Sequence, residues 1–162
     1  MAKVIMTCGR ICSGKSTYAE KLRNELNAVI LSVDELTLAL FNNETGEMHD
    51  VYVERAEKYL YEKSVQIVQA GVNVILDWGF WTKNEREYAK GFYGSRHIEC
   101  EIHYINIDDL LWKKRIEGRN ELVKAGKVSA YYVDEGLARK FASIFEEPEE
   151  YEINKIISQI GV

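Results

Sequence analysis

The feature that most constrains this chain is the segment from Gly9 to Ser16. It reads G-x-x-x-x-G-K-S, follows the apolar run Val4–Met6, and precedes a segment with a helical pattern at Ser16–Leu22. A strand, a glycine-containing turn and a helix in this order form a loop whose backbone amides surround a phosphate. The motif therefore predicts a site for the phosphates of a nucleoside triphosphate.

Each residue type in this motif has its own task. Gly9 and Gly14 allow backbone conformations that a side chain obstructs, and the dipole of the following helix favours an anion. Lys15 supplies a cation for the β- and γ-phosphates, and the Ser16 hydroxyl is an oxygen ligand of the kind that Mg²⁺ prefers. We therefore expect ATP (or, alternatively, GTP) with Mg²⁺ as cofactors. The residues expected to bind the nucleotide are Gly9, Arg10, Ile11, Cys12, Ser13, Gly14, Lys15, Ser16, Thr17 and Arg119.

The composition is typical of one globular domain without a polyanionic partner. The chain has 162 residues, 46% of them hydrophobic, and a net charge of −5. This size favours a single domain over residues 1–162, and the acidic balance argues against nucleic acid as a partner. No leader and no apolar run of about 18 residues is seen, so we expect a cytoplasmic protein without a membrane span. The three cysteines have no metal-ligand spacing, which fits a reducing compartment.

Apolar runs alternate with helical patterns along the whole chain. The runs are short and continuous, as expected for strands that are buried on both faces of a parallel sheet. This alternation predicts an α/β fold of three layers, with about five mostly parallel strands and helices on both faces. The predicted strands are 3–8, 28–33, 72–77 and 98–107, the predicted helices are 15–27, 34–41, 51–70, 82–92, 108–125 and about 130–145, and the tail at 151–160 fits either a strand or a helix.

Two acids follow predicted strands, at the edge where such sheets bind ligands. Asp34 follows the second strand, where a carboxylate can take a proton from an acceptor hydroxyl or orient that hydroxyl for attack. It is also a good helix N-cap, and both roles are compatible. Asp77 ends the third strand, and we expect it to contact Mg²⁺, directly or through water, or to bind the acceptor.

Aromatic and basic residues complete the set of candidates. Trp78 and Trp81 either pack in the core or form a flat wall for a ring-bearing acceptor. Arg115 and Arg119 are four residues apart and share a helix face, where they either stabilise the migrating phosphoryl group or form a solvated charged surface. Arg86 follows the third strand and is a candidate for the acceptor site.

Taken together, these positions resemble the small AAA-type P-loop kinases, a group near chloramphenicol phosphotransferase, zeta toxin and the 5'-polynucleotide kinase domain. The resemblance spans nearly the whole chain and implies a P-loop NTPase fold of the kinase type. It implies transfer of the γ-phosphate of Mg-ATP to a hydroxyl of a small molecule, with Asp34 as general base. The segments that carry it are the P-loop, Asp34, Ile75–Asp77 with Arg86, Arg115–Asn120 and Phe145–Pro148. Arg115 or Arg119 would lie on a lid at about 108–130.

Two departures from related kinases narrow the choice of acceptor. Thr37 stands where polynucleotide kinases typically have an arginine, and the segment after Asp77 lacks the Pro-Arg of adenylate-kinase-like enzymes. The alternatives that stay open are a zeta-toxin-like nucleotide-sugar kinase, a polynucleotide 5'-hydroxyl kinase, and a nucleotide-dependent switch or NTPase. A GTPase switch is disfavoured because neither N-K-x-D nor D-x-x-G occurs at the expected places.

Overall fold

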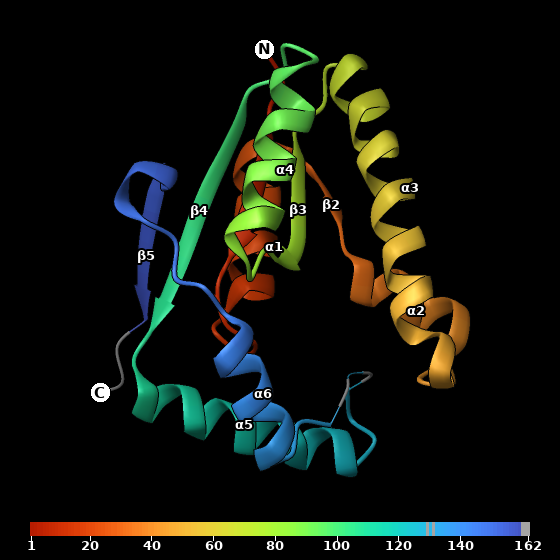
Figure 1. Cartoon of the computed structure of the whole chain (residues 1–162), viewed down its shortest axis with the longest axis vertical. Coiled ribbons are helices and arrows are strands. Elements are labelled where there is room, and N and C mark those ends of the chain that lie inside the picture. Colours follow the sequence, from red (N-terminus) through yellow and green to blue (C-terminus); the bar gives the residue numbers. More distant parts are fainter. Residues whose placement is uncertain (129, 131, 160–162) are drawn as a thin grey trace.

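The computed structural model describes residues 1–128, 130 and 132–159, and shows a parallel sheet between layers of helices (Figure 1). Residues 129, 131 and 160–162, which include parts of the predicted helix at 130–145 and of the tail, lie outside the described residues. The strands are β1 (Val4–Cys8), β2 (Val29–Leu31), β3 (Val74–Gly79), β4 (Cys100–Ile107) and β5 (Lys155–Gln159). The helices are α1 (Lys15–Leu26), α2 (Val33–Phe41), α3 (His49–Gln69), α4 (Lys83–Gly94), α5 (Asp109–Lys124) and α6 (Glu135–Ile144), with 3₁₀ turns at Gly46–Met48 and Glu150–Glu152.

The strand order is β2-β3-β1-β4-β5, and each of the four pairings is parallel. The predicted three-layer α/β fold is therefore confirmed. The C-terminal tail, which the sequence left open, forms β5 and pairs with β4 from His103 opposite Lys155 onward. Because β1 lies at the centre of the sheet, the loop that follows it opens at the middle of the carboxyl edge.

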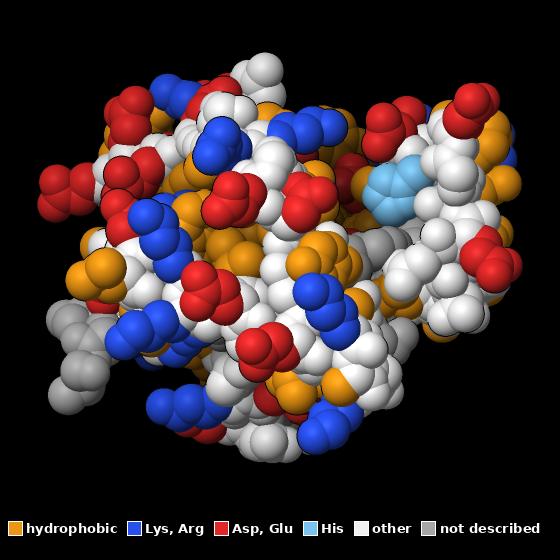
Figure 2. All heavy atoms as spheres, turned by 90° about the horizontal axis from the view of Figure 1, so that it is seen from below, with side chains coloured by type: hydrophobic (Ala, Val, Ile, Leu, Met, Phe, Trp, Pro, Cys, Tyr) orange, Lys and Arg blue, Asp and Glu red, His pale blue; other side chains and the backbone are white. Residues whose placement is uncertain are grey.

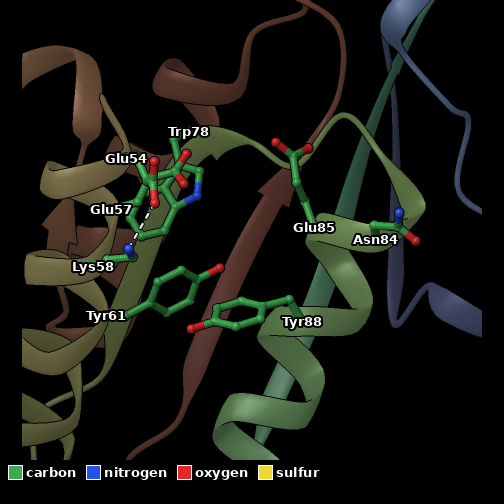
Figure 3. A pocket seen from close by; sticks show the side chains of 8 residues that line it. All are labelled: Glu54, Glu57, Lys58, Tyr61, Trp78, Asn84, Glu85 and Tyr88. Carbon is green, nitrogen blue, oxygen red and sulfur yellow. Dashed lines mark hydrogen bonds and ion pairs between the residues drawn. The ribbon is translucent and has the colours of Figure 1, made fainter. Parts of the chain in front are cut away.

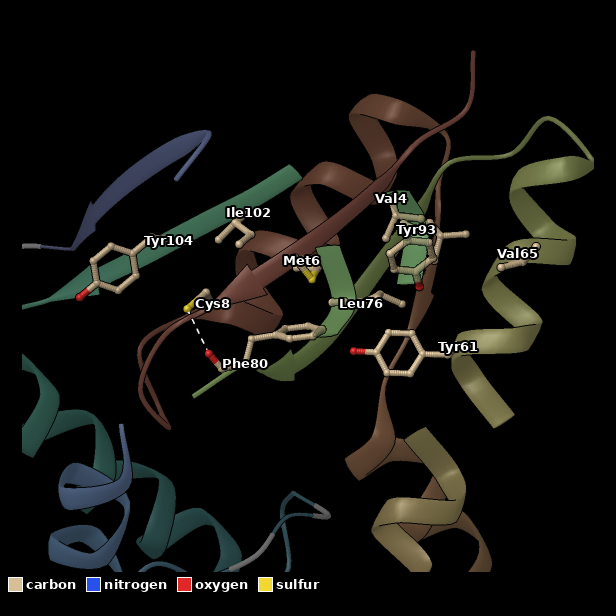
Figure 4. Close-up of a cluster of buried hydrophobic side chains, with 12 residues drawn as sticks. Val4, Met6, Cys8, Tyr61, Val65, Leu76, Phe80, Tyr93, Ile102 and Tyr104 are labelled. Atoms are coloured by element: carbon tan, nitrogen blue, oxygen red, sulfur yellow. Dashed lines mark hydrogen bonds between the residues drawn. The ribbon is translucent and has the colours of Figure 1, made fainter. Parts of the chain in front are cut away.

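The two faces of the sheet are covered by different helices. Side chains alternate along β1, so that Val4 and Met6 pack toward α3 and α4 while Ile5 packs toward α1. Figure 4 shows the larger of these clusters, in which Tyr61 of α3 and Tyr93 of α4 lie over β1 and β3. No helix in the described parts of the chain has the length and apolar character needed to cross a membrane.

Two helices begin at residues that differ from the sequence prediction, because in each case a side-chain N-cap sets the first turn. α2 is capped by Ser32, whose hydroxyl accepts a hydrogen bond from the Glu35 amide at 3.2 Å. Asp34 therefore lies in the first turn and is not the N-cap. The helix expected from about residue 130 is α6, which starts only after Asp134, because the Asp134 carboxylate accepts a hydrogen bond from the Leu137 amide at 2.7 Å.

Candidate functional site

The loop between β1 and α1 needs both of its motif glycines. A Cβ atom at Gly9 would lie 2.7 Å from the carbonyl oxygen of Ile105, which is closer than side-chain carbons approach such an atom. Gly14 has a φ of +101°, in the left-handed region that favours glycine, and it directly precedes α1. The loop thus turns tightly against β4 and leads into the N-terminus of α1, where amides favour an anion.

Lys15 is folded back over this loop. Its ammonium group donates a hydrogen bond to the carbonyl oxygen of Arg10 at 2.7 Å. Burial lowers the pKa of Lys15, and the nearby carboxylates of Asp77 and Asp34 oppose that shift. Asp77 lies in β3 and Asp34 in the first turn of α2, so the lysine lies beside acids from two separate elements.

Asp77 connects the P-loop helix to the end of β3. Its carboxylate is only 9% exposed and accepts hydrogen bonds from the hydroxyls of Ser16, at 2.8 Å, and of Thr7, at 2.9 Å. A P-loop hydroxyl beside a buried carboxylate is a donor set of hard oxygens that fits Mg²⁺ bound together with phosphates. Thr7 was missed by sequence reasoning, although a polar residue inside the apolar run of β1 was a usable signal.

Asp34 lies close enough to Lys15 of the P-loop for the two charges to interact. Its side chain reaches solvent, but crowding by the surrounding protein removes part of its hydration and raises the pKa of the carboxyl group. Arg119 and Lys15 oppose this shift, and Asp77 adds to it. The structure therefore brings together four of the predicted site residues, from α1, α2, β3 and α5.

Helix α5 is attached to the P-loop by side-chain hydrogen bonds along one face. Trp112 Nε1 donates to the carbonyl oxygen of Ile11 at 2.6 Å, and Arg115 Nη1 donates to that of Ser13 at 3.0 Å. One turn further, Arg119 Nη1 lies 3.3 Å from the Cys12 sulfur. Arg115 is thus bound to loop backbone, whereas Arg119 is the α5 arginine whose charge acts on Asp34.

Arg10 and Trp112 form a further contact between the loop and α5. The Arg10 guanidinium lies 4.3 Å from the centre of the Trp112 ring, and it also donates hydrogen bonds to Asp109 and to the carbonyl oxygen of Ile107. Sequence reasoning missed Trp112, because nothing in its local pattern distinguishes it from an ordinary core residue of a helix.

Arg86 lies in a different environment from the one expected for a residue that binds the acceptor. Its side chain is 1% exposed and donates to the Glu152 carboxylate at 2.9 Å. It also donates to the carbonyl oxygens of Phe80, at 3.0 Å, and Glu146, at 2.9 Å. These contacts join the β3–α4 turn to the C-terminal segment. Arg86 is therefore a buried residue that connects two segments, and its side chain does not lie on an open surface.

Trp78, within β3, and Trp81, after it, point to different elements and do not form one wall. The turn between them has positive φ values at Gly79, +90°, and Phe80, +49°. Trp81 packs against Phe141 of α6, with ring centres 4.7 Å apart. Trp78 packs edge-on against Tyr61 of α3, with ring centres 5.3 Å apart.

Trp78 also lines a cleft between α3 and α4, close to the carboxyl end of β3 (Figure 3). The cleft has a volume of about 340 Å³. Its lining combines three aromatic rings, three carboxylates, one ammonium group and one amide: Tyr61, Trp78, Tyr88, Glu54, Glu57, Glu85, Lys58 and Asn84.

The carboxyl edge of the sheet is also hollowed on a larger scale. Figure 2 views the molecule from below and shows a hollow between the part formed by α5 and α6 and the lobe that carries α2. Basic and acidic side chains are interspersed over the α5 and α6 side of this face. The hollow therefore separates the basic helix that contacts the P-loop from the helix that carries Asp34.

Comparison with known proteins identifies the family to which this chain belongs. The model of the AAA domain family matches residues 4–141. No curated protein sequence shows significant similarity to the chain. Among solved structures, a candidate kinase from Chloroflexus aurantiacus has a TM-score of 0.75 at 16% identity, over 98% of this chain and 88% of that chain.

Two further structures share the fold. The APS kinase CysC of Mycobacterium tuberculosis, in complex with AMPPNP and APS, has a TM-score of 0.69 at 16% identity, over 97% of this chain and 88% of that chain. Kti12 of Chaetomium thermophilum, in complex with ADP-AlF3, has a TM-score of 0.70 at 15% identity over the same shares, 97% and 88%. The family match and the shared fold show that this chain belongs to the AAA domain family and has the fold of the P-loop kinases.

Proposed function

We propose that this protein is a kinase that transfers the γ-phosphate of Mg-ATP to a hydroxyl group of a small molecule. The observation that carries the proposal is the position of Asp34. This carboxylate lies at the sheet edge beside the P-loop, within electrostatic range of Lys15 and Arg119. A carboxylate in such a place serves a kinase, because an acceptor hydroxyl must be oriented toward the γ-phosphate.

In this proposal, each residue of the site has a separate role in phosphoryl transfer. The amides of the P-loop and the Lys15 ammonium hold the β- and γ-phosphates, and the Arg119 guanidinium neutralises charge on the migrating group. Ser16 and Asp77 would hold Mg²⁺, which supplies charge neutralisation at the phosphates when it is bound. Asp34 orients the acceptor hydroxyl and receives its proton, while the acceptor oxygen bonds to the γ-phosphorus and the bond from phosphorus to the β-γ bridging oxygen breaks, leaving ADP.

The environment of Asp34 suits this role. Partial burial raises the pKa of its carboxyl group, which makes the carboxylate a better proton acceptor near neutral pH than an ordinary exposed aspartate. The opposing charges of Arg119 and Lys15 limit that shift, so the carboxylate keeps its ionised form available. The group is thus accessible to an acceptor, and its pKa is shifted in the direction that favours uptake of a proton.

Several observations favour a small acceptor over a polynucleotide. Thr37, at the position where polynucleotide kinases typically have an arginine, is 1% exposed and carries no charge. The chain as a whole has a net charge of −5. One structure of the same fold is an APS kinase with AMPPNP and APS bound, which supports a nucleotide and a small molecule as the two ligands here.

An acceptor screen tests this proposal. The protein is incubated with Mg-ATP and a collection of small alcohols, and ADP and phosphorylated products are followed by mass spectrometry. We expect at least one alcohol to gain a phosphate in a one-to-one ratio with ADP, and Lys15→Ala to abolish the reaction. ADP release at one constant rate with every compound, without any phosphorylated product, would instead indicate an NTPase or switch and would refute the proposal.

A further inference from the structure

The cleft between α3 and α4 has walls of aromatic rings. Tyr61 lies between the other two rings, with its centre 5.3 Å from that of Trp78, at 85°, and 5.4 Å from that of Tyr88, at 75°. Trp78 directly follows Asp77 in β3, and successive strand side chains point to opposite faces, so the cleft lies on the α3 and α4 face near the carboxyl end of the strand that carries Asp77. Figure 3 shows the Tyr61 and Tyr88 side chains pointing toward one another from the two helices.

The charged groups of the cleft are mostly acidic. Glu54, Glu57 and Glu85 line it, against the single ammonium group of Lys58. The Lys58 ammonium group forms an ion pair with the Glu54 carboxylate at 2.8 Å. The Glu85 carboxylate accepts a hydrogen bond from the Thr82 amide, also at 2.8 Å. For Glu57, no hydrogen bond or ion pair is found within the described part of the chain.

Among the residues that the structure describes, Glu57 is therefore an acid without a counter-charge. Burial raises the pKa of its carboxyl group to about 7, and the neighbouring carboxylates of Glu85 and Glu54 add to the shift. The groups that face it are Glu54 and Lys58 on α3, Trp78 on β3, and Glu85 and Tyr88 on α4. A cation in the cleft would supply the missing charge, whereas an anion would add to the repulsion.

We propose that the acceptor alcohol carries a protonated amine or quaternary ammonium group, which binds in this cleft against Glu57 and the rings of Tyr61, Trp78 and Tyr88. Aromatic faces attract cations through their quadrupole, and a carboxylate at the same place adds a direct charge interaction. Trp78 lies near the carboxyl end of β3, the edge that also carries the P-loop, so the proposal requires the hydroxyl of the same small molecule to extend around this edge toward the P-loop. This inference rests on the proposed function and names the class of its substrate.

Binding of a simple cation tests the cleft without requiring turnover. The probe is choline, compared with 3,3-dimethylbutan-1-ol, which has the same shape without the charge, in NMR titrations at low salt. We expect choline to bind at least about tenfold more tightly than its neutral analogue. We also expect Glu57→Gln to weaken choline binding by about tenfold, because it removes the unpaired charge while keeping the side-chain shape.

The control keeps the same change of charge on the same helix. Glu62→Gln alters an exposed residue of α3 that pairs with Arg96 at 3.5 Å, outside the cleft. We expect it to leave choline binding unchanged. Equal binding of choline and its neutral analogue, or equal effects of Glu57→Gln and Glu62→Gln, would overturn the inference.

The aromatic wall is tested separately at Tyr88, which is 57% exposed and so tolerates substitution. Tyr88→Leu removes the ring, and we expect choline binding to weaken by about threefold to tenfold. Tyr88→Phe keeps the ring and should bind choline as the unmodified protein does. If both variants bind alike, the ring does not hold the cation and the inference fails.

Phosphate transfer separates this inference from the proposed function. Amine-bearing alcohols and their neutral analogues are compared as acceptors under the conditions of the screen. Transfer only to neutral alcohols, with no effect of Glu57→Gln, would overturn the inference and leave the kinase proposal intact. Glu57-dependent choline binding without transfer to any alcohol would refute the kinase proposal and retain a cation site. Transfer that prefers the amine-bearing alcohols, and that Glu57→Gln weakens, supports both.

Discussion

Ser16 and Asp77 are joined directly, since the Ser16 hydroxyl donates a hydrogen bond of 2.8 Å to Oδ2 of the Asp77 carboxylate. Ser16 lies in the first turn of α1 and Asp77 lies in β3, so this bond connects the phosphate-binding helix to the neighbouring strand. Thr7, from β1, binds the other carboxylate oxygen at 2.9 Å. The carboxylate is thus held in one orientation by two elements.

If Ser16 and Asp77 hold Mg²⁺, a substitution in this pair should weaken the binding of Mg²⁺ more than the binding of the nucleotide. We expect Asp77→Asn to raise the Mg²⁺ concentration needed for half-maximal turnover by about 10–100-fold. The exposed Asp50→Asn serves as the charge-matched control and should leave it unchanged. Turnover is measured at fixed ATP over a series of Mg²⁺ concentrations. An identical Mg²⁺ dependence in the two variants would exclude Asp77 from the metal site.

Thr7 holds Asp77 and should contribute to stability. Thr7→Val removes a hydroxyl that is 0% exposed and leaves a buried carboxylate oxygen without its donor. We expect the free energy of unfolding to fall by about 1–3 kcal/mol in urea titrations. The same change at the exposed Thr17 should cost less than about 0.5 kcal/mol. Equal losses at both positions would show that the Thr7 hydrogen bond does not matter.

Arg115 and Arg119 are expected to act on different kinetic constants. Arg119 acts on Asp34 and should stabilise the transferred group, so Arg119→Ala should lower kcat by about 10³-fold with a smaller change in the affinity for ATP. Arg115 holds the Ser13 carbonyl, so Arg115→Ala should mainly weaken ATP binding. Steady-state kinetics and equilibrium ATP binding separate the two effects. A loss confined to ATP binding in Arg119→Ala would contradict the role given to this residue.

Arg86 and Glu152 form a buried ion pair whose loss should affect the whole fold. Their side chains are 1% and 7% exposed. We expect Arg86→Ala to lower the free energy of unfolding by about 3–5 kcal/mol, because it leaves a buried charge without a partner. Arg96→Ala, which breaks the exposed pair with Glu62, should cost less than about 1 kcal/mol. Chemical denaturation compares the two, and similar losses would contradict a structural role for Arg86.

Glu57 should make the stability depend on pH. Its pKa is raised from 4.5 to about 7, so the folded protein binds more protons at this position than the unfolded chain does between these values. Stability should therefore fall as the pH rises from about 5 to about 7 and then level off. Glu57→Gln should remove this part of the slope. Denaturation curves at several pH values test the point, and parallel profiles for both proteins would show that the carboxyl group is not perturbed.

The sequence predicted the parts of the molecule that local pattern determines. The P-loop motif placed Lys15 and Ser16, and the apolar runs placed four of the five strands, because burial on both faces leaves a continuous hydrophobic signature. The first residues of α2 and α6 were less well predicted than their last residues, since Ser32 and Asp134 compete with neighbouring residues that cap a helix equally well.

Contacts between distant segments were not predictable in this way. Trp112 binds the Ile11 carbonyl across 101 positions, and Arg86 binds Glu152 across 66. No spacing or motif in the sequence indicates such a pair. Arg86 was therefore interpreted as a candidate for the acceptor site, because it follows a strand. The cleft of α3 and α4 was only partly anticipated, through Trp78, because its three acids and its two other rings are divided between two helices that are distant in the sequence.

The most direct test of the kinase account is the rate of phosphate transfer in Asp34→Asn. The variant keeps the shape of the side chain and removes its charge, and Glu35→Gln, at the exposed neighbouring position, is the matched control. The account predicts that Asp34→Asn lowers kcat for the acceptor by about 10²–10⁴-fold while ATP binds nearly as before, and that Glu35→Gln behaves as the unmodified protein. Unchanged turnover in Asp34→Asn would contradict it.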